Sequence, residues 1–169
     1  MRWMWIDRIV ELVPRTRLVA VKNVSMAEEQ LHQHFAASGT LPALPLMPAC
    51  FIVEGMAQSA GILVGHAEDF REKVILAKVS RCELELDVPP GFTIRHTATI
   101  QQMDTAGAST LGTVELLDPA HPELPPRLVG NIDLMFSHID RNMAGMEFPE
   151  HNFVFSESFV TLLRMSGVR

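Results

Sequence analysis

Two side chains of this sequence, His34 and Glu54, are of the types that move protons near neutral pH. An imidazole has an ordinary pKa of about 6.5, so His34 is suited to act as a general base. Glu54 stands among apolar neighbours, and burial of a carboxyl group raises its pKa and suits it to act as a general acid. Gln58 follows four residues later, which on a helix puts both side chains on one face. Such a set is suited to proton removal beside a carbonyl group.

Residues 48–67 predict one long helix that carries this acid. Pro48 suits the first turn of a helix, and the apolar side chains that follow lie on every side, so the rest of the domain must enclose them. The first backbone N–H groups of a helix have no partner within it, and those near Ala49 and Cys50 could polarise a carbonyl oxygen. The helix therefore offers both an acid and an oxyanion site.

The same stretch is almost long enough to cross a bilayer, which takes about 20 apolar residues. Glu54 at its centre would be costly in lipid, and no cluster of Lys or Arg flanks it. Three prolines crowd its start, namely Pro42, Pro45 and Pro48. We therefore expect a buried helix and no membrane span.

The stretches around this helix predict strands. Residues 74–79 are apolar on both faces, which predicts a central strand. Short turns join most of the segments, so the pairing is expected to be antiparallel. The fold class is α+β, a curved antiparallel sheet of about six strands wrapped around the long helix. The expected strands are 5–12, 17–24, 74–79, 92–103, 109–117 and 128–136.

The composition changes after residue 139, which divides the chain into a domain at 1–139 and an extension at 140–169. Apolar residues of the extension recur at helical spacing, which predicts a short amphipathic helix that docks on the outer sheet or on a neighbouring subunit. Ser156 is its expected cap. A second short helical turn is expected at 27–31, capped by Ser25 with Glu28.

Charge and cysteine content exclude some classes of protein. The formal net charge of −6 argues against nucleic-acid binding, which needs a basic face. The two cysteines stand in apolar segments, which favours reduced thiols over a disulfide framework. Charged residues interrupt the first stretch, so no signal peptide is expected and the predicted location is the cytoplasm. The histidines lack ligand spacing, so no metal site is expected.

Three short motifs carry a resemblance to a known family. They are HF at 34–35, PLMPAC at 45–50 and EGMAQ at 54–58. Together they resemble the core motif of the hot-dog-fold 3-hydroxyacyl-(acyl-carrier-protein) dehydratases of fatty acid synthesis. The likeness also includes LVAVKNVS at 18–25 and the Pro-Gly turn at 90–91, and it covers roughly residues 5–136.

The resemblance implies roles for individual residues. His34 would remove the Cα proton of a 3-hydroxyacyl thioester, and Glu54 would protonate the departing hydroxyl group. The oxyanion and substrate-binding positions would be Ala49, Cys50 and Gln58, with Gln58 orienting the acid. The resemblance also implies a substrate carried by acyl carrier protein or coenzyme A, no cofactor, and a homodimer with shared active sites or a trimer of dimers.

This chain departs from the family pattern at three points. The His34–Glu54 spacing is longer by about six residues, an insertion that costs little because closure entropy grows logarithmically with length. Ala49 stands where the family has glycine. The approach to the Pro-Gly turn is acidic where the family often has basic residues, which leaves Arg71, Lys73, Lys78 and Arg81 as candidates for carrier docking.

Two other functions fit the same residues. In a hot-dog acyl thioesterase, Glu54 would activate water and His34 would be incidental. In a non-catalytic acyl-binding subunit, the longer loop would keep His34 away from Glu54. Cys50 at a helix start could also act as a nucleophile, although the role of a small apolar filler suits its position better.

Overall fold

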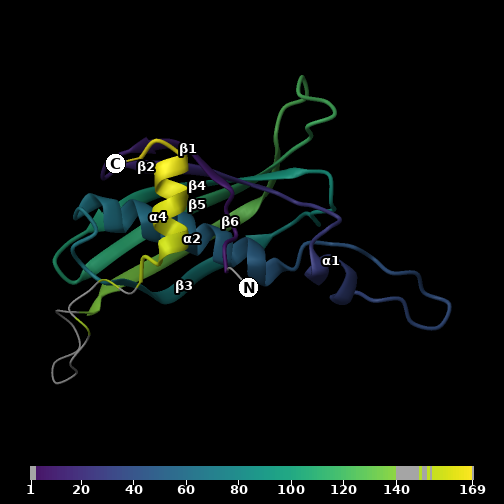
Figure 1. Ribbon diagram of the computed structural model, residues 1–169, viewed down its shortest axis with the longest axis horizontal. Coiled ribbons are helices and arrows are strands. Elements are labelled where there is room, and N and C mark those ends of the chain that lie inside the picture. The colour runs from purple at the N-terminus through teal and green to yellow at the C-terminus, as the bar shows by residue number, and fades with distance from the viewer. Residues whose placement is uncertain (1–2, 140–148, 150–151, 153, 169) are drawn as a thin grey trace.

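The computed structural model describes residues 3–139, 149, 152 and 154–168. Its strands form one antiparallel sheet, and its long helix lies across one face of that sheet (Figure 1). The strands are β1 (Arg8–Val13), β2 (Arg17–Asn23), β3 (Val74–Leu84), β4 (Thr93–Met103), β5 (Gly107–Leu117) and β6 (Arg127–His138). The helices are α1 (Glu29–Gln33), α2 (Ala49–Ala67) and α4 (Glu157–Met165). The α+β class and the six-stranded sheet are confirmed.

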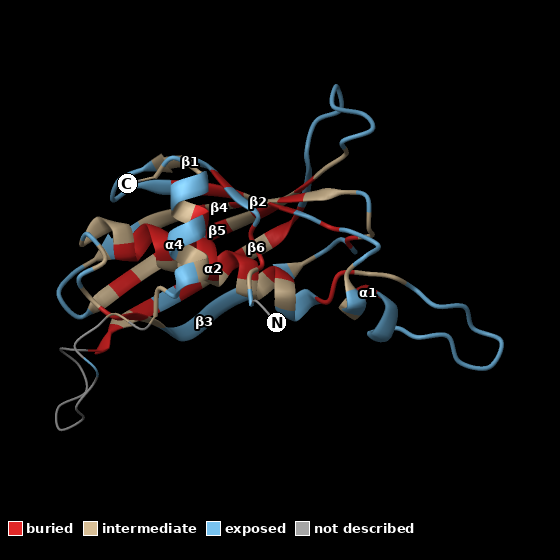
Figure 2. Ribbon diagram, viewed as in Figure 1, coloured by how far each residue is buried: buried red, intermediate tan, exposed pale blue. Residues whose placement is uncertain are grey.

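The strand order is β1-β2-β4-β5-β6-β3, so β3 forms one edge of the sheet. The prediction that residues 74–79 form a central strand is therefore wrong. Leu76 and Val79 are exposed at 40% and 41%, and most of the strand is pale blue in Figure 2. The sequence pattern of an apolar edge strand is the same as that of a central strand, because the pattern does not depend on how many strands lie beside it. The edge position also leaves a row of backbone groups available for pairing with another chain.

Helix α2 is enclosed because small residues let it approach the sheet closely. A Cβ at Gly55 would lie 2.6 Å from His96 Nε2, a buried side chain of β4. In the other direction, a Cβ at Gly112 of β5 would lie 2.7 Å from the sulfur of Met56. Real Cβ atoms do not come so close to other atoms, so the close contact of helix and sheet depends on these two glycines.

Among the described helices, α2 is the one long and apolar enough to span a bilayer. Ten of its residues are buried, including Ile52, Met56 and Leu63, and they belong to the same hydrophobic core as the inner face of the sheet. This packing is that of the core helix of a globular domain (Figure 2).

The short helix expected in the extension forms as α4, but it docks elsewhere than predicted. It lies across α2 on the side away from the sheet (Figure 1), and its far end reaches the edge strand β1, where Ser166 Oγ accepts a hydrogen bond from Ile9 N at 3.0 Å. Leu162 is buried in the core. The expected cap, Ser156, occupies the N-cap position without a side-chain hydrogen bond. Residues 140–148, on which part of the extension falls, lie outside the described residues.

The segment before α1 also differs from its expected form. Helix α1 begins at Glu29 with Glu28 at the N-cap, while Ser25 Oγ accepts a hydrogen bond from Ala27 N at 3.1 Å. Ser25 thus closes the turn that leads into the helix and does not cap it.

Candidate active site

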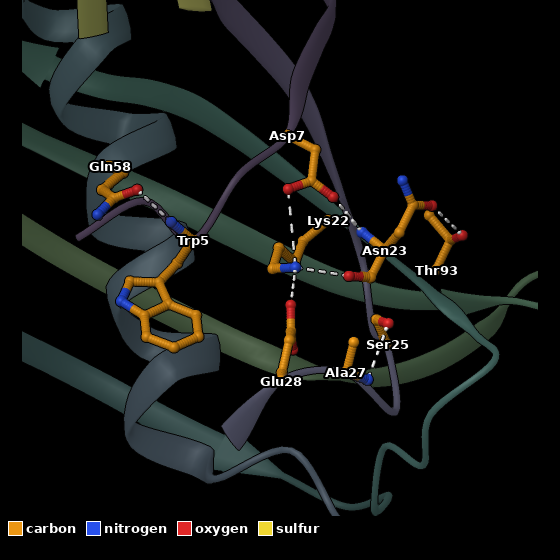
Figure 3. A network of polar contacts seen from close by, with 9 residues as sticks. All are labelled: Trp5, Asp7, Lys22, Asn23, Ser25, Ala27, Glu28, Gln58 and Thr93. Atoms are coloured by element: carbon orange, nitrogen blue, oxygen red, sulfur yellow. Dashed lines mark hydrogen bonds and ion pairs between the residues drawn. The ribbon is translucent and has the colours of Figure 1, made fainter. Parts of the chain in front are cut away.

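Glu54 and Gln58 lie on one face of α2, where the half-buried carboxyl group meets the buried amide. Gln58 Nε2 donates a hydrogen bond to Glu54 Oε1 at 3.0 Å. The other end of the amide is also fixed, because Gln58 Oε1 accepts from Trp5 N at 2.8 Å (Figure 3) and Nε2 donates a second bond to Trp3 O at 3.1 Å. The backbone before β1 therefore determines which way the amide faces, and the amide determines which carboxyl oxygen is engaged.

This arrangement leaves the second carboxyl oxygen of Glu54 as the one that can carry a proton. A protonated carboxyl group donates through one oxygen and accepts through the other. Since Oε1 accepts from Gln58, the donor oxygen is Oε2. The sequence predicted the shared face of the two residues, but it gave no sign of the role of Trp5, because that contact joins residues far apart in the chain.

A cavity of about 280 Å³ lies beside Glu54. Glu54 and Gln58 supply its polar side chains, and the other lining residues are apolar or glycine. The carboxyl group is half-buried in the single chain. The full lining is Glu54, Ala57, Gln58, Gly61, Ile62, Val74, Ile75, Leu76, Phe136, Val154, Phe155 and Phe159. A carboxyl group at an apolar cavity is a suitable place for acid chemistry on a substrate with an apolar tail.

His34 lies in a different cavity of the same chain. It is the C-cap residue of α1, it is exposed, and its ring packs edge-on against Phe35 at 4.3 Å. It lines a cavity of about 310 Å³ together with Ala49 at the start of α2 and with Leu84–Val88, which are the last residue of β3 and the loop after it. One chain therefore brings His34 to the candidate oxyanion site at Ala49 and places Glu54 in another cavity.

The longer loop between His34 and α2 leaves the surroundings of the histidine compact. Leu44 N donates to Phe35 O at 3.0 Å, and residues Ser38 and Leu41 pair as an isolated bridge. The two ends of the longer loop therefore lie close together. The loop between them projects beyond α1 in Figure 1. At the end of this loop, Met47 N donates a hydrogen bond to Val88 O at 2.8 Å. This bond holds the start of α2 against the loop that follows β3.

A buried lysine anchors α1 and so places His34. Lys22 of β2 is 5% exposed, and its ammonium group contacts Glu28, Asp7 and the carbonyl oxygen of Asn23 (Figure 3). The contact with Asp7 is 3.6 Å and that with Asn23 O is 2.5 Å. Since Glu28 is the N-cap of α1, the lysine holds the start of that helix against the sheet. His32, two residues before His34, is engaged elsewhere, with Nε2 at 2.6 Å from Met26 O.

The remaining candidates of the sequence lie at the surface, with one exception. Cys50 is exposed beside Ala49, and neither it nor Cys82 forms a disulfide. Among the expected docking cations, Arg71 pairs with Asp69 at 2.9 Å and Arg81 pairs with Glu83 at 2.5 Å, while Lys78 is exposed. Lys73 is 6% exposed, so it presents less of its side chain to a docking partner than the other three cations do.

A fully buried histidine lies directly under the site. His96 of β4 packs against Gly55, and neither ring nitrogen has a hydrogen-bond partner. Desolvation lowers the pKa of His96 from 6.5 to about 3, so the ring is neutral. Within the part of the chain that the structure describes, no group of three or more His, Cys, Asp or Glu side chains is placed to hold a metal ion.

Comparison with known proteins identifies relatives of this arrangement. The family model described as "FabA-like domain" matches residues 2–116. A curated protein of Solibacter usitatus, named 3-hydroxyacyl-(acyl-carrier-protein) dehydratase FabZ, is 34% identical over 127 residues, which cover 73% of this chain and 74% of the relative. A protein of the same name from Ruminiclostridium cellulolyticum is 38% identical over 96 residues. That match covers 56% of this chain and 63% of the relative, slightly under two thirds of its length.

Solved structures share the fold at low sequence identity. The dehydratase heterocomplex ApeI:P from Xenorhabdus doucetiae matches with a TM-score of 0.60 and 13% identity, over 83% of this chain and 86% of that one. An acyl-CoA hydrolase from Staphylococcus aureus matches with a TM-score of 0.56 and 12% identity, over 75% and 67% of the two chains. At this identity the likeness establishes the architecture alone, which is the hot-dog fold.

Proposed function

This chain belongs to the FabA-like family, and on that premise we propose that it dehydrates 3-hydroxyacyl thioesters to trans-2-enoyl thioesters. The observation that carries the proposal is the orientation of Glu54 by Gln58 at the mouth of an apolar cavity. A carboxyl group whose Oε1 accepts a hydrogen bond presents Oε2 as its acidic oxygen. The site thereby gains a directed proton donor for a leaving hydroxyl group.

The proposed reaction is a base- and acid-assisted elimination. The His34 imidazole removes a proton from Cα, and the electrons of that C–H bond form the double bond between Cα and Cβ. The Cβ–O bond breaks as Glu54 Oε2 delivers its proton, so the hydroxyl group leaves as water. Negative charge on the thioester oxygen is stabilised by the N–H of Ala49, the first residue of α2, whose position in the helix gives it no partner within the helix. Proton exchange with solvent then resets the two side chains.

The proposed active unit is a homodimer in which His34 of one chain serves Glu54 of the other. Its support is that within a single chain these residues line different cavities. The edge strand β3 gives a surface for the pairing, because its exposed edge carries apolar residues such as Leu76 and Val79. The opposite edge, β1, is engaged by Ser166 instead. Three such dimers could assemble further.

The proposed substrates are thioesters of acyl carrier protein or coenzyme A in fatty acid or related lipid synthesis. The proposed location is the cytoplasm, in line with the composition of the chain. Arg71, Lys78 and Arg81 are the proposed contacts for an acidic carrier protein. Their neighbouring acids weaken that surface, since Arg71 and Arg81 already pair with Asp69 and Glu83.

The test is to incubate the purified protein with 3-hydroxybutyryl and crotonyl thioesters of both carriers and to follow enoyl absorbance in both directions. We expect interconversion by the wild type and its loss in Glu54→Gln, which keeps the shape of the side chain and removes the acid. Release of free thiol without enoyl formation would instead indicate a thioesterase, for which Glu54 alone would suffice. Binding without either reaction would indicate an acyl-binding subunit.

A further inference from the structure

The cavity beside Glu54 is a groove that residues from the far end of the chain close. One face of α2 forms its floor, from Glu54 to Ile62, and the start of β3 with Phe136 of β6 forms one wall. The remaining wall comes from Val154, Phe155 and Phe159. These three residues lie beyond residue 116, where the match to the family ends. The match to the family model therefore does not include this wall.

The polar and apolar parts of the groove are separated along α2. Glu54 and Gln58 lie at one end, and Gly61 lies about two helical turns, or roughly 10 Å, further along. One more turn on, the ring of Phe155 lies over Gly65, where an added Cβ would come within 2.8 Å of Phe155 Cε2. The absence of a side chain at Gly65 is what allows the phenyl ring to reach the helix.

The aromatic wall is held in place at both ends. Before it, Asn152 Nδ2 donates to Phe70 O at 2.9 Å and to Glu72 O at 3.1 Å, and Asn152 Oδ1 accepts from Val154 N at 3.2 Å. The Phe155 ring packs edge-on against Phe70 and Phe159, with centroids 4.8 and 6.0 Å apart. After it, Leu162 is buried in the core. A wall anchored in this way can limit the length of what enters the groove.

We propose that Phe155 and Phe159 form the end wall of an acyl groove and restrict the substrate to short and medium acyl chains. The proposal rests on the proposed function, since it takes the occupant to be the acyl tail of the substrate whose hydroxyl group Glu54 protonates. The lining of the groove on α2 ends at Ile62, before Gly65, so the free length is the roughly 10 Å from Glu54 to Gly61. A fully extended chain advances about 3.6 Å per three bonds, and this length accommodates about eight bonds. An octanoyl tail fits this length, and a hexadecanoyl tail runs into the aromatic wall.

The first test measures kcat/KM for 3-hydroxybutyryl, 3-hydroxyoctanoyl and 3-hydroxyhexadecanoyl thioesters with the full chain. We expect the wild type to discriminate against the longest substrate. Phe155→Ala should raise the ratio of hexadecanoyl to octanoyl kcat/KM roughly tenfold or more, because each buried methylene is worth about fourfold and removal of the phenyl ring makes room for several. The matched control is Val160→Ala, on the exposed side of α4 and outside the groove. An unchanged ratio in a folded, active Phe155→Ala protein overturns the proposal and leaves the dehydratase intact.

A second variant acts in the opposite direction and does not threaten folding. A Cβ at Gly61 would lie 3.6 Å from Phe136 Cε1, an ordinary contact, and alanine favours a helix over glycine. Gly61→Ala narrows the groove. It should lower the ratio of octanoyl to butyryl kcat/KM about fourfold, which is the contribution of one methylene that the groove no longer accepts. If Phe155→Ala does not fold, this variant decides, and no shift in preference overturns the proposal.

A binding measurement separates this proposal from the proposed function. Octanoyl- and hexadecanoyl-coenzyme A carry no 3-hydroxyl group and cannot be dehydrated, so calorimetric titration with them needs no turnover. Tighter binding of the octanoyl thioester by the wild type, reversed in Phe155→Ala, supports the groove even if no substrate is dehydrated. Equal affinities for the two thioesters in the wild type overturn the groove even if 3-hydroxybutyryl thioester is dehydrated.

Discussion

The side chain of Gln58 donates a hydrogen bond to Glu54 across one turn of α2, at 3.0 Å, while its own oxygen accepts from the backbone of Trp5. The amide cannot turn over without losing both contacts. A segment that crosses α2 before β1 thus fixes the carboxyl group of a residue on α2. The chemistry of the site consequently depends on a contact between residues that are far apart in the sequence.

Replacing Gln58 should slow turnover more than it weakens binding. Gln58→Leu removes the hydrogen bond that orients the carboxyl group, and a bond of this kind is worth about 1.5–3 kcal/mol, which corresponds to roughly 10- to 150-fold in kcat. The measurement is steady-state kinetics on 3-hydroxybutyryl thioester. The control is the neighbouring Ser59→Ala, whose hydroxyl group bonds only within the helix, to Gly55 O at 2.8 Å. Equal kcat in both variants would remove Gln58 from the site.

Two inactive variants should restore activity when they are combined. Mixed dimers of His34→Ala and Glu54→Gln chains contain one site with both functional residues, if the two residues of a site come from different chains. Random exchange then gives about a quarter of the wild-type activity, because half of the dimers are mixed and each has one complete site. The measurement is activity after co-refolding. No recovery in demonstrably mixed dimers would mean that the site is not shared in this way.

Gly55→Ala should destabilise the protein, whereas Gly61→Ala should not. A Cβ at position 55 would lie 2.6 Å from His96 Nε2 and 2.9 Å from Trp5 O, so the helix must move from the sheet. Overpacking of this kind costs about 1–3 kcal/mol. At position 61 the nearest atom would be 3.6 Å away. Urea denaturation of both variants checks the difference.

Burial of His96 should make stability depend on pH. Its pKa is lowered to about 3 in the folded protein, while the unfolded chain has the ordinary value near 6.5. Above pH 6.5 the ring is neutral in both states, so the free energy of unfolding has its full value. Between pH 6.5 and 3 the unfolded chain binds a proton on this ring that the folded protein does not bind. Stability therefore falls by up to about 1.4 kcal/mol per pH unit as the pH drops through this window. Unfolding of wild type and His96→Leu across the window should show a smaller slope in the variant.

Replacing Lys22 should loosen α1 in particular. Lys22→Met leaves Glu28 and Asp7 without their shared cation, at a cost of about 1–3 kcal/mol or more. Hydrogen exchange of the α1 amides should accelerate relative to that of α2. The control is Arg17→Met, whose exposed pair with Glu11 contributes little. Unchanged protection of α1 in the Lys22 variant would show that another contact anchors it.

Local signals in the sequence were sufficient for most of the elements. The run of apolar and small residues after Pro48 predicted α2 to within one residue at its start, and the four-residue spacing of Glu54 and Gln58 predicted their contact. The alternating segments predicted the strands of the sheet. These features depend on the period of the backbone and on neighbouring residues, so a single sequence carries them.

The tertiary structure decided how those elements are arranged. It placed β3 at an edge, buried Lys73, laid α4 across α2, and separated His34 from Glu54 into two cavities of one chain. It also brought Trp5 to Gln58 and Phe155 to Gly65. Each of these depends on which distant surfaces exclude water from one another, and that choice is made by the packing of the whole domain rather than by any local pattern.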